Sequence, residues 1–157
     1  MSPGCIRTYM TLIGMVSISE DGLGNIDGVY LPGQNLPARR DEETGAIAEA
    51  ARQIDEYLLG RRRAFDLPLS LGGTEFQKSV WSEILKIPYG ELATYSEVAE
   101  RAGRPRAFRA AGTACGANPV PIIVPCHRVV GSSGSADRYG GGAALKRRLI
   151  ELERGGA

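Results

Sequence analysis

The segment that decides how the second half of this chain folds is residues 118–130, which read NPVPIIVPCHRVV. Its three prolines, Pro119, Pro121 and Pro125, cannot donate to a sheet ladder, so a central strand position is excluded. The valines and isoleucines between them favour burial. The pattern predicts a rigid extended segment, with Cys126 directly after its stiffest part.

Two short helices are predicted immediately before this segment. Thr94 and Glu97 form a capping-box pattern, and the helix that they begin stops at Gly103. Pro105 suits the first turn of a second helix, predicted over residues 105–116. Two short helices joined by a turn that contains glycine outline a helix-turn-helix, with the second helix in the recognition position.

A glycine pair, Gly72 and Gly73, indicates the boundary between a domain 1–72 and a domain 73–157. Thr74 begins a further capping box with Gln77. The helix that follows carries its large apolar residues on one face, as expected for a helix that packs on a core: Phe76, Val80, Trp81, Ile84 and Leu85. At the other end of this domain, residues 131–142 predict a loop and residues 143–153 a basic amphipathic helix.

The first half predicts a small sheet with one helix. Loose alternation and turn signals over residues 6–31 indicate two or three antiparallel strands, and residues 32–41 indicate a loop. Residues 44–59 have the spacing of an amphipathic helix, and residues 64–71 have the composition of another strand. The fold class is therefore α/β (α+β), with a sheet-plus-helix domain before a mainly helical one.

Charge differs between the two halves. Residues 1–72 hold seven Lys and Arg against ten Asp and Glu, whereas residues 73–157 hold twelve against eight. The basic second half suits a polyanionic partner, although many such charges only solvate a surface. The sequence has no apolar run long enough to cross a bilayer and no basic stretch followed by an apolar one at its start, so we expect a soluble, cytoplasmic protein.

The chain has three cysteines, and only one of them has a histidine beside it. Cys126 precedes His127, the single histidine, and Arg128; Cys5 and Cys115 have no such neighbours and are interpreted as bystanders. Cationic neighbours lower a thiol pKa, so we expect Cys126 to be a good nucleophile. No C-x-x-C pair or Cys/His cluster offers a metal site.

The histidine could serve the thiol as a base. Adjacent residues of an extended segment point to opposite faces, so His127 could act on Cys126 through a water rather than directly. A catalytic imidazole needs an acceptor that orients it, and the last helix offers both Glu151 and Glu153. The residues alone leave two interpretations open, a nucleophilic enzyme and a buried structural thiol.

Residues 118–130 closely resemble the active-site signature of the O6-alkylguanine-DNA alkyltransferases, also called methylated-DNA–protein-cysteine methyltransferases. The resemblance extends over essentially the whole second half, through residues 73–81 (GTEFQKSVW), 87–91 (IPYGE), 94–96 (TYS), 107–112 (AFRAAG) and 139–142 (YGGG). The first half matches only in outline, as the family's RNase H-like sheet and helix with a supporting role. The resemblance implies a winged-helix-like second domain.

The resemblance implies a role for particular residues. Cys126 would be the alkyl acceptor, His127 with a water would take its proton, and Glu153 would orient His127. Tyr95 would hydrogen-bond the extruded guanine and help protonate the departing base, and Arg109 would fill the space that the nucleotide leaves. The remaining positions implied to contact substrate or DNA are Arg106, Ala107, Ala110, Asn118, Arg128, Val129 and Gly140.

The implied activity is direct-reversal DNA repair by base flipping. The implied partner is double-stranded DNA containing O6-alkylguanine, and possible substrates extend to O4-alkylthymine; each molecule would act once, without a cofactor or metal. We expect a monomer, with cooperative binding on DNA left open. The loop over residues 131–138 is implied to border the alkyl pocket, so it bears on which alkyl groups are accepted.

Three other functions were weighed against this one. A non-enzymatic sensor of alkylated DNA is related, but such proteins lack the acceptor cysteine and typically carry tryptophan in its place. A helix-turn-helix regulator would bind DNA without covalent change. A cysteine hydrolase would need an oxyanion site and would turn over.

Overall fold

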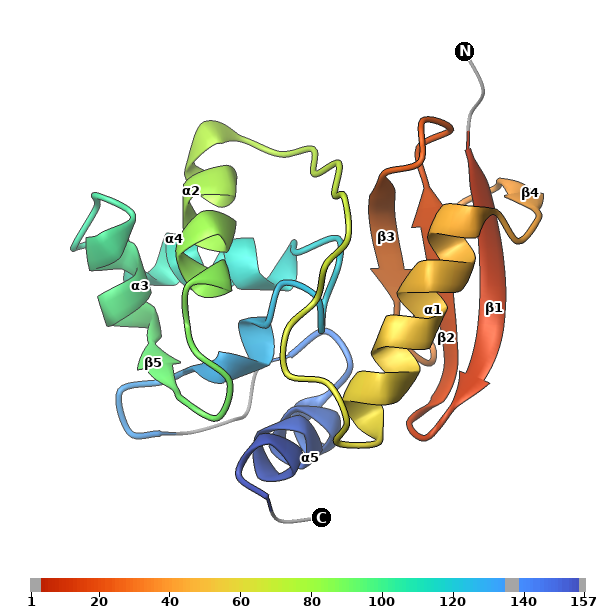
Figure 1. Cartoon of the computed structure of the whole chain (residues 1–157). Helices are drawn as coiled ribbons and strands as arrows, with labels where there is room; N and C mark the ends of the chain where they lie inside the picture. The colour runs from red at the N-terminus through yellow and green to blue at the C-terminus, as the bar shows by residue number, and fades with distance from the viewer. Residues whose placement is uncertain (1–3, 135–138, 156–157) are drawn as a thin grey trace. The chain divides into compact units, whose positions relative to one another are not determined.

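A computed structural model describes residues 4–134 and 139–155 of the chain (Figure 1). The chain divides into two compact units, Met1–Leu71 and Gly72–Ala157, one residue away from the boundary expected at the glycine pair. None of the helices within the described residues is long and apolar enough to cross a membrane.

The first unit holds a four-stranded mixed sheet in the order β3-β2-β1-β4. Strands β1 (Cys5–Thr11) and β2 (Gly14–Glu20) form an antiparallel hairpin, and β3 (Ile26–Tyr30) pairs antiparallel with β2. The short strand β4 (Arg40–Asp41) pairs parallel with β1, inside a segment that the sequence predicted to be loop. The two-residue length of β4 explains why no alternating pattern marks it.

Helix α1 (Gly45–Leu58) packs against the sheet of this unit, as Figure 1 shows. Thr44 caps its first turn by accepting a hydrogen bond from the Ile47 backbone N–H. The helix and the strands bury a shared apolar core that excludes water: Val16, Ile18, Ile26, Val29, Leu31, Ile47, Ile54 and Tyr57.

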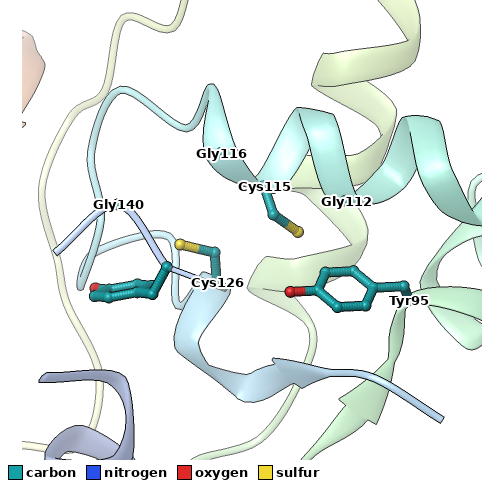
Figure 2. Close-up of a pocket in the computed structure, with 7 residues that line it drawn as sticks. Tyr95, Gly112, Cys115, Gly116, Cys126 and Gly140 are labelled. Carbon is teal, nitrogen blue, oxygen red and sulfur yellow. The ribbon is translucent and has the colours of Figure 1, made fainter. Parts of the chain in front are cut away.

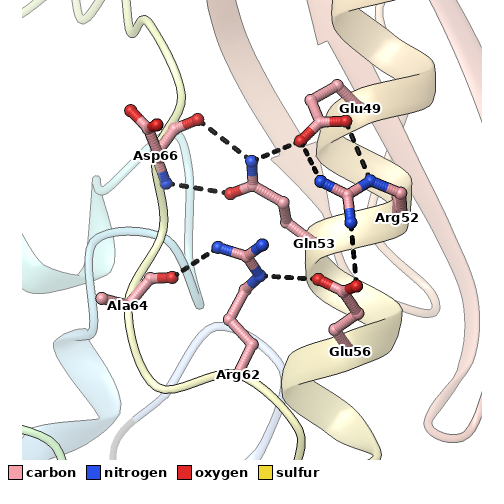
Figure 3. Close-up of polar contacts among 7 residues, drawn as sticks. All are labelled: Glu49, Arg52, Gln53, Glu56, Arg62, Ala64 and Asp66. Atoms are coloured by element: carbon pink, nitrogen blue, oxygen red, sulfur yellow. Dashed lines mark hydrogen bonds and ion pairs between the residues drawn. The ribbon is translucent and has the colours of Figure 1, made fainter.

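The segment after α1 is not the strand that was predicted for residues 64–71. The buried side chain of Gln53 bonds both backbone groups of Asp66, accepting from its N–H at 2.9 Å and donating to its carbonyl at 3.0 Å (Figure 3). Arg62 donates to Glu56 and to the Ala64 carbonyl. Pro68 has no N–H to donate to a ladder, and within the described residues this segment forms one sheet-like bridge, between Ile26 and Leu69.

The second unit is mainly helical. Helix α2 (Glu75–Leu85) and helix α3 (Tyr95–Arg101) each begin with a complete capping box, which confirms both predictions from the sequence. Helix α4 (Phe108–Gly116) starts three residues later than the predicted range and contacts both α2 and α3. The arrangement of α3, a glycine-containing turn and α4 is that of a helix-turn-helix.

A single aromatic residue anchors these helices. Trp81 of α2 is 2% exposed, and its indole N–H donates to the Ala114 carbonyl of α4 at 2.8 Å. This bond satisfies the only polar atom of the indole while its rings fill the core. The position of α4 is therefore fixed from the interior of the unit.

The proline-rich segment ends in a tight turn rather than in an extended run. Residues Cys126–Arg128 form a 3-10 turn, η1, followed by strand β6 (Val129–Val130), which pairs parallel with β5 (Ala93–Thr94). The expectation that Cys126 and His127 alternate across a strand is therefore wrong. Helix α5 (Ala143–Glu153) closes the unit, and part of the loop before it, residues 135–138, lies outside the described residues.

Candidate active site

A pocket of about 380 Å³ lies within the second unit, and Cys126 is on its wall. Figure 2 shows Tyr95, Cys115 and Cys126 around it, together with three glycines that line it without side chains. The segments that form the wall come from α3, α4, η1 and the start of the segment before α5. The parallel pairing of β5 with β6 brings two of these segments together, since β5 runs directly into Tyr95 and β6 follows η1.

The Cys126 thiol is held in one orientation. Its side chain belongs to a residue only 5% exposed, and the Asn118 amide donates to its sulfur at 3.3 Å. The same amide donates to the Val124 carbonyl at 2.9 Å, and its oxygen accepts from the Val120 N–H at 3.0 Å. Asn118 therefore links the turn after α4 to the sulfur, a place that agrees with its expected bridging role.

The backbone just before the thiol is strained. Ile122 has a φ of 77°, which a bulky β-branched residue rarely adopts, and its side chain is buried. The Val124 N–H donates to the Val120 carbonyl at 3.0 Å and closes a turn around it. Strain of this kind persists only where the surrounding structure enforces it, and it is common beside functional groups.

Burial raises the pKa of the Cys126 thiol to about 11, which overturns the expectation of a lowered value. The Asn118 amide and the positive charge of Lys146 act in the opposite direction but do not compensate. The cationic neighbours expected from the sequence do not help the thiol, because Arg128 is committed to a carboxylate and His127 has its own pKa lowered by burial. The resting thiol is therefore protonated at neutral pH.

His127 and Glu153 form a buried hydrogen-bonded pair. The His127 Nε2 lies 2.7 Å from a Glu153 carboxylate oxygen, and the imidazole is fully buried. Because an ionised carboxylate only accepts, Nε2 carries the proton and Nδ1 is the basic nitrogen of the neutral ring. Of the two carboxylates that the sequence left open, the structure brings Glu153 to His127, whereas Glu151 is exposed.

Arg128 is the third residue of this buried cluster. It donates to both oxygens of Glu153, at 2.8 and 3.0 Å, and to the Ile87 carbonyl at 2.7 Å. The residue is 7% exposed and its guanidinium is bonded inside the protein, so the side chain is not presented to solvent for the DNA contact expected of it. The guanidinium instead orients the Glu153 carboxylate through these two bonds.

Lys146 is a site residue that the sequence analysis missed. It is 1% exposed, and its ammonium donates to the Val129 carbonyl at 2.5 Å and to the Tyr95 hydroxyl at 3.3 Å. A signal existed, because Lys146 and Glu153 are seven residues apart on α5 and so share one helix face. From the sequence only a basic amphipathic helix was predicted here, and no role was assigned to this lysine.

Cys115 also has a place that the sequence did not indicate. It lies in the last turn of α4 on the wall of the Cys126 pocket, although it was interpreted as a bystander. Burial raises the pKa of its thiol to about 12, above that of Cys126. Of the two thiols in this pocket, Cys126 is therefore the one more readily ionised.

The residues expected to contact DNA fall into two groups. Gly140 lines the pocket, whereas Val129 does not line it, and its carbonyl accepts a hydrogen bond from the Lys146 ammonium. Apart from Asn118 and Arg128, described above, the others gather at the beginning of α4, where the side chains face solvent or are half-buried, and none of them lines the pocket: Arg106, Ala107, Arg109 and Ala110.

Comparisons with known proteins agree on one family. Residues 75–155 match the DNA-binding domain of 6-O-methylguanine DNA methyltransferase. A methylated-DNA–protein-cysteine methyltransferase of Methanosarcina barkeri is 46% identical over 138 residues, which is 86% of each chain. One from Mycobacterium leprae is 53% identical over 112 residues, covering 71% of this chain and 68% of that protein.

The fold agrees with the same family. The structure resembles that of Mycobacterium tuberculosis OGT, crystallised in complex with DNA, with a TM-score of 0.91 and 41% identity over 98% of this chain and 94% of that one. The expected combination of an N-terminal mixed sheet with a helix and a C-terminal helical DNA-binding domain is thereby confirmed. This chain belongs to the methylated-DNA–protein-cysteine methyltransferase family.

Proposed function

We propose that this protein repairs O6-alkylguanine in double-stranded DNA by transferring the alkyl group to its own Cys126. The observation that carries the assignment is the Cys126 thiol on the wall of a pocket. The next residue in the sequence, His127, is buried and bonded to Glu153. Family membership supplies the substrate class, a methyl group on guanine O6, and a cysteine as the acceptor.

The nucleotide must leave the helix before this chemistry is possible. An O6-alkyl carbon inside a duplex is shielded from in-line attack, and extruding the base costs a few kcal/mol. A pocket of about 380 Å³ that is lined by two tyrosines, two cysteines and three glycines suits an entire base rather than a small group. Binding of the extruded base inside the pocket offsets the cost of extrusion.

The thiol proton has a path to the protein interior. His127 is neutral because burial lowers its pKa, so Nδ1 is able to accept a proton, directly or through a water. The imidazolium that forms is stabilised by the carboxylate of Glu153, which Arg128 and the Gly90 N–H hold in place. The Cys126 thiolate then attacks the alkyl carbon, and the electron pair of the C–O6 bond goes to guanine.

Tyr95 and Lys146 serve the departing base. The Lys146 ammonium donates to the phenol oxygen of Tyr95, so the phenol proton is directed elsewhere, and we assign it to guanine as the C–O6 bond breaks. The ammonium charge also favours the thiolate form of Cys126. The product is guanine in DNA and a thioether on Cys126.

DNA binding is assigned to α3 and α4. In this proposal Arg109 occupies the gap that the extruded nucleotide leaves, Arg106 contacts phosphate, and the small residues Ala107 and Ala110 allow close approach of α4. Backbone groups of Val129 and Gly140 contact the guanine edge. The exposure of the start of α4 and the basic charge of the second unit support this assignment.

The acceptor is consumed in the reaction, because a thioether has no easy leaving route. Each molecule therefore acts once. The proposal also includes a monomeric protein and a supporting role for residues 1–72.

The proposal is tested by intact-mass spectrometry with an oligonucleotide duplex that contains O6-methylguanine. We expect a stoichiometric gain of one methyl group, located on Cys126 by peptide mapping, and no gain in Cys126→Ala. Cys115→Ala serves as the matched control and should still be methylated. An unchanged mass with retained binding would instead indicate a non-enzymatic sensor of alkylated DNA.

A further inference from the structure

The first residue of α4 is an exposed aromatic. Phe108 is 46% exposed, and among the described residues of the second unit only Leu85, on α2, is a similarly exposed large apolar residue. A half-exposed phenyl ring gains little from the fold, because much of its apolar area stays in water. The core of this unit therefore does not account for a phenylalanine at this position.

One arginine contacts this ring, and two more lie close to it in the sequence. The Arg109 guanidinium lies 5.8 Å from the Phe108 ring centroid, within the range of a cation–π contact. Arg104 and Arg106 are exposed in the turn that leads into α4. A nearby phenylalanine, Phe76, has a different position, because it is half-buried and lies beneath Arg104 at 5.0 Å.

We propose that Phe108 is a DNA-contacting residue, which packs against deoxyribose and base edges beside the extruded nucleotide. The inference rests on the proposed function, in which Arg109 enters the DNA. When Arg109 leaves the Phe108 ring for the duplex, the face of the ring that the guanidinium covered becomes available to the groove. In the free protein Arg109 thus lies against the face of the Phe108 ring that DNA later contacts.

The chemistry around the ring selects DNA over an apolar protein surface. An apolar partner would have to desolvate the guanidiniums of Arg106 and Arg109 without compensation, which is costly. Nucleic acid offers phosphates to the arginines and sugar and base faces to the ring, and apolar side chains pack between or against bases in many minor-groove complexes. A ring flanked by arginines therefore matches a polyanion that also has apolar faces.

A contact from Phe108 differs from an arginine contact in how it affects the dependence of DNA affinity on salt. Binding of duplex DNA containing O6-methylguanine is measured with Cys126→Ser proteins at several salt concentrations, so that no transfer occurs. Phe108→Ala should weaken binding roughly tenfold, in line with loss of an aromatic contact to nucleic acid. The dependence of affinity on salt should stay unchanged, because a neutral side chain releases no counterions.

Two controls accompany this measurement. Leu85→Ala removes an equally exposed apolar side chain from α2 and should leave DNA affinity unchanged. The rate of methyl transfer from free O6-methyl-2′-deoxyguanosine, measured in the proteins that retain Cys126, should be equal in Phe108→Ala and the unsubstituted protein, because Phe108 does not line the pocket. Failure of the unsubstituted protein on both substrates would contradict the proposed function itself.

Three results would overturn the inference about Phe108. The first is unchanged affinity for DNA in Phe108→Ala. The second is a loss of affinity together with a weaker salt dependence, which would mean that the ring acts only through the charge of Arg109. The third is an equal loss of rate on DNA and on the free nucleoside, which would mean that the substitution disturbs the pocket.

Discussion

The ammonium nitrogen of Lys146 lies 3.3 Å from the phenol oxygen of Tyr95, inside the second unit of the fold. Lysine is almost never fully buried without polar partners, and here the Val129 carbonyl is a second acceptor. The bond joins the last helix to the first helix of the helix-turn-helix. It makes the charge on α5 part of the candidate site.

Replacing this lysine should slow alkyl transfer more than it changes DNA binding. Lys146→Met keeps the length and the apolar stem of the side chain but removes the donor to Tyr95, and we expect a loss of roughly tenfold or more in the single-turnover rate. Arg147→Met, an exposed neighbour on the same helix, is the control and should react at the normal rate. Equal rates for the two variants would remove Lys146 from the mechanism.

The carboxylate of Glu153 should matter for stability as well as for activity. Glu153→Gln leaves the buried guanidinium of Arg128 without its counter-charge, which typically costs 3–5 kcal/mol of unfolding free energy, as an order-of-magnitude expectation. Glu151→Gln, an exposed carboxylate of the same helix, should change the unfolding free energy by less than about 0.5 kcal/mol. Denaturant unfolding of both variants measures the difference, and similar midpoints would contradict the buried pairing.

The pKa of Cys126 predicts how its reactivity depends on pH. Burial raises that pKa to about 11, so the thiolate is the minor form at neutral pH. As long as the pH stays below 11, the thiolate fraction increases about tenfold for each unit by which the pH rises. Alkylation of Cys126 by iodoacetamide, followed by peptide mapping in the free protein, should therefore accelerate steadily from pH 7 to pH 10. A rate that is already level above pH 8 would show that the thiol pKa is not raised.

Asn118 gives a matched test of the same thiol. Its amide donates to the sulfur and lowers the Cys126 pKa, so Asn118→Ala should raise that pKa further and slow the alkylation at every pH below it. Asn25→Ala, in a turn of the first unit, is a control and should leave the profile unchanged. A faster reaction in Asn118→Ala would mean that the amide restricts access more than it stabilises the thiolate.

Salt should reveal which arginines contact phosphate. Arg106 is exposed in the turn before α4, and Arg106→Ala should reduce the slope of log affinity against log salt by about one. Arg52 is the control, because it is exposed but paired with Glu49 and Glu56 in the first unit (Figure 3). An unchanged slope in Arg106→Ala would remove this residue from the phosphate contacts.

Local signals in the sequence predicted the helices well. The capping boxes at Thr74 and Thr94 fix where α2 and α3 begin, since the side chain and backbone groups that satisfy each helix end are all within four residues. The prediction of a strand over residues 64–71 was wrong because a bonding partner of this segment lies far away in the sequence. The backbone groups of Asp66 bond the side chain of Gln53, a contact across thirteen residues that no local pattern encodes.

Only part of the candidate site was predictable from the sequence, and its electrostatics were not. The resemblance of residues 118–130 to the family signature indicated Cys126 and His127, and the pairing of His127 with Glu153 agrees with the expected role. The direction of the Cys126 pKa was predicted wrongly, because adjacency in sequence says nothing about burial or about which carboxylate Arg128 binds. Lys146 was missed for the same reason.

Glu153 is the last residue of α5, and it stands 26 positions after the histidine that it orients. During synthesis the ribosome therefore completes the thiol, the imidazole and the guanidinium well before it adds the carboxylate that joins them. Any chain that stops short of residue 153 lacks the partner of two buried basic groups. In the proposed mechanism the proton path of a single-use acceptor is thus completed last, so unfinished copies of the protein would lack it.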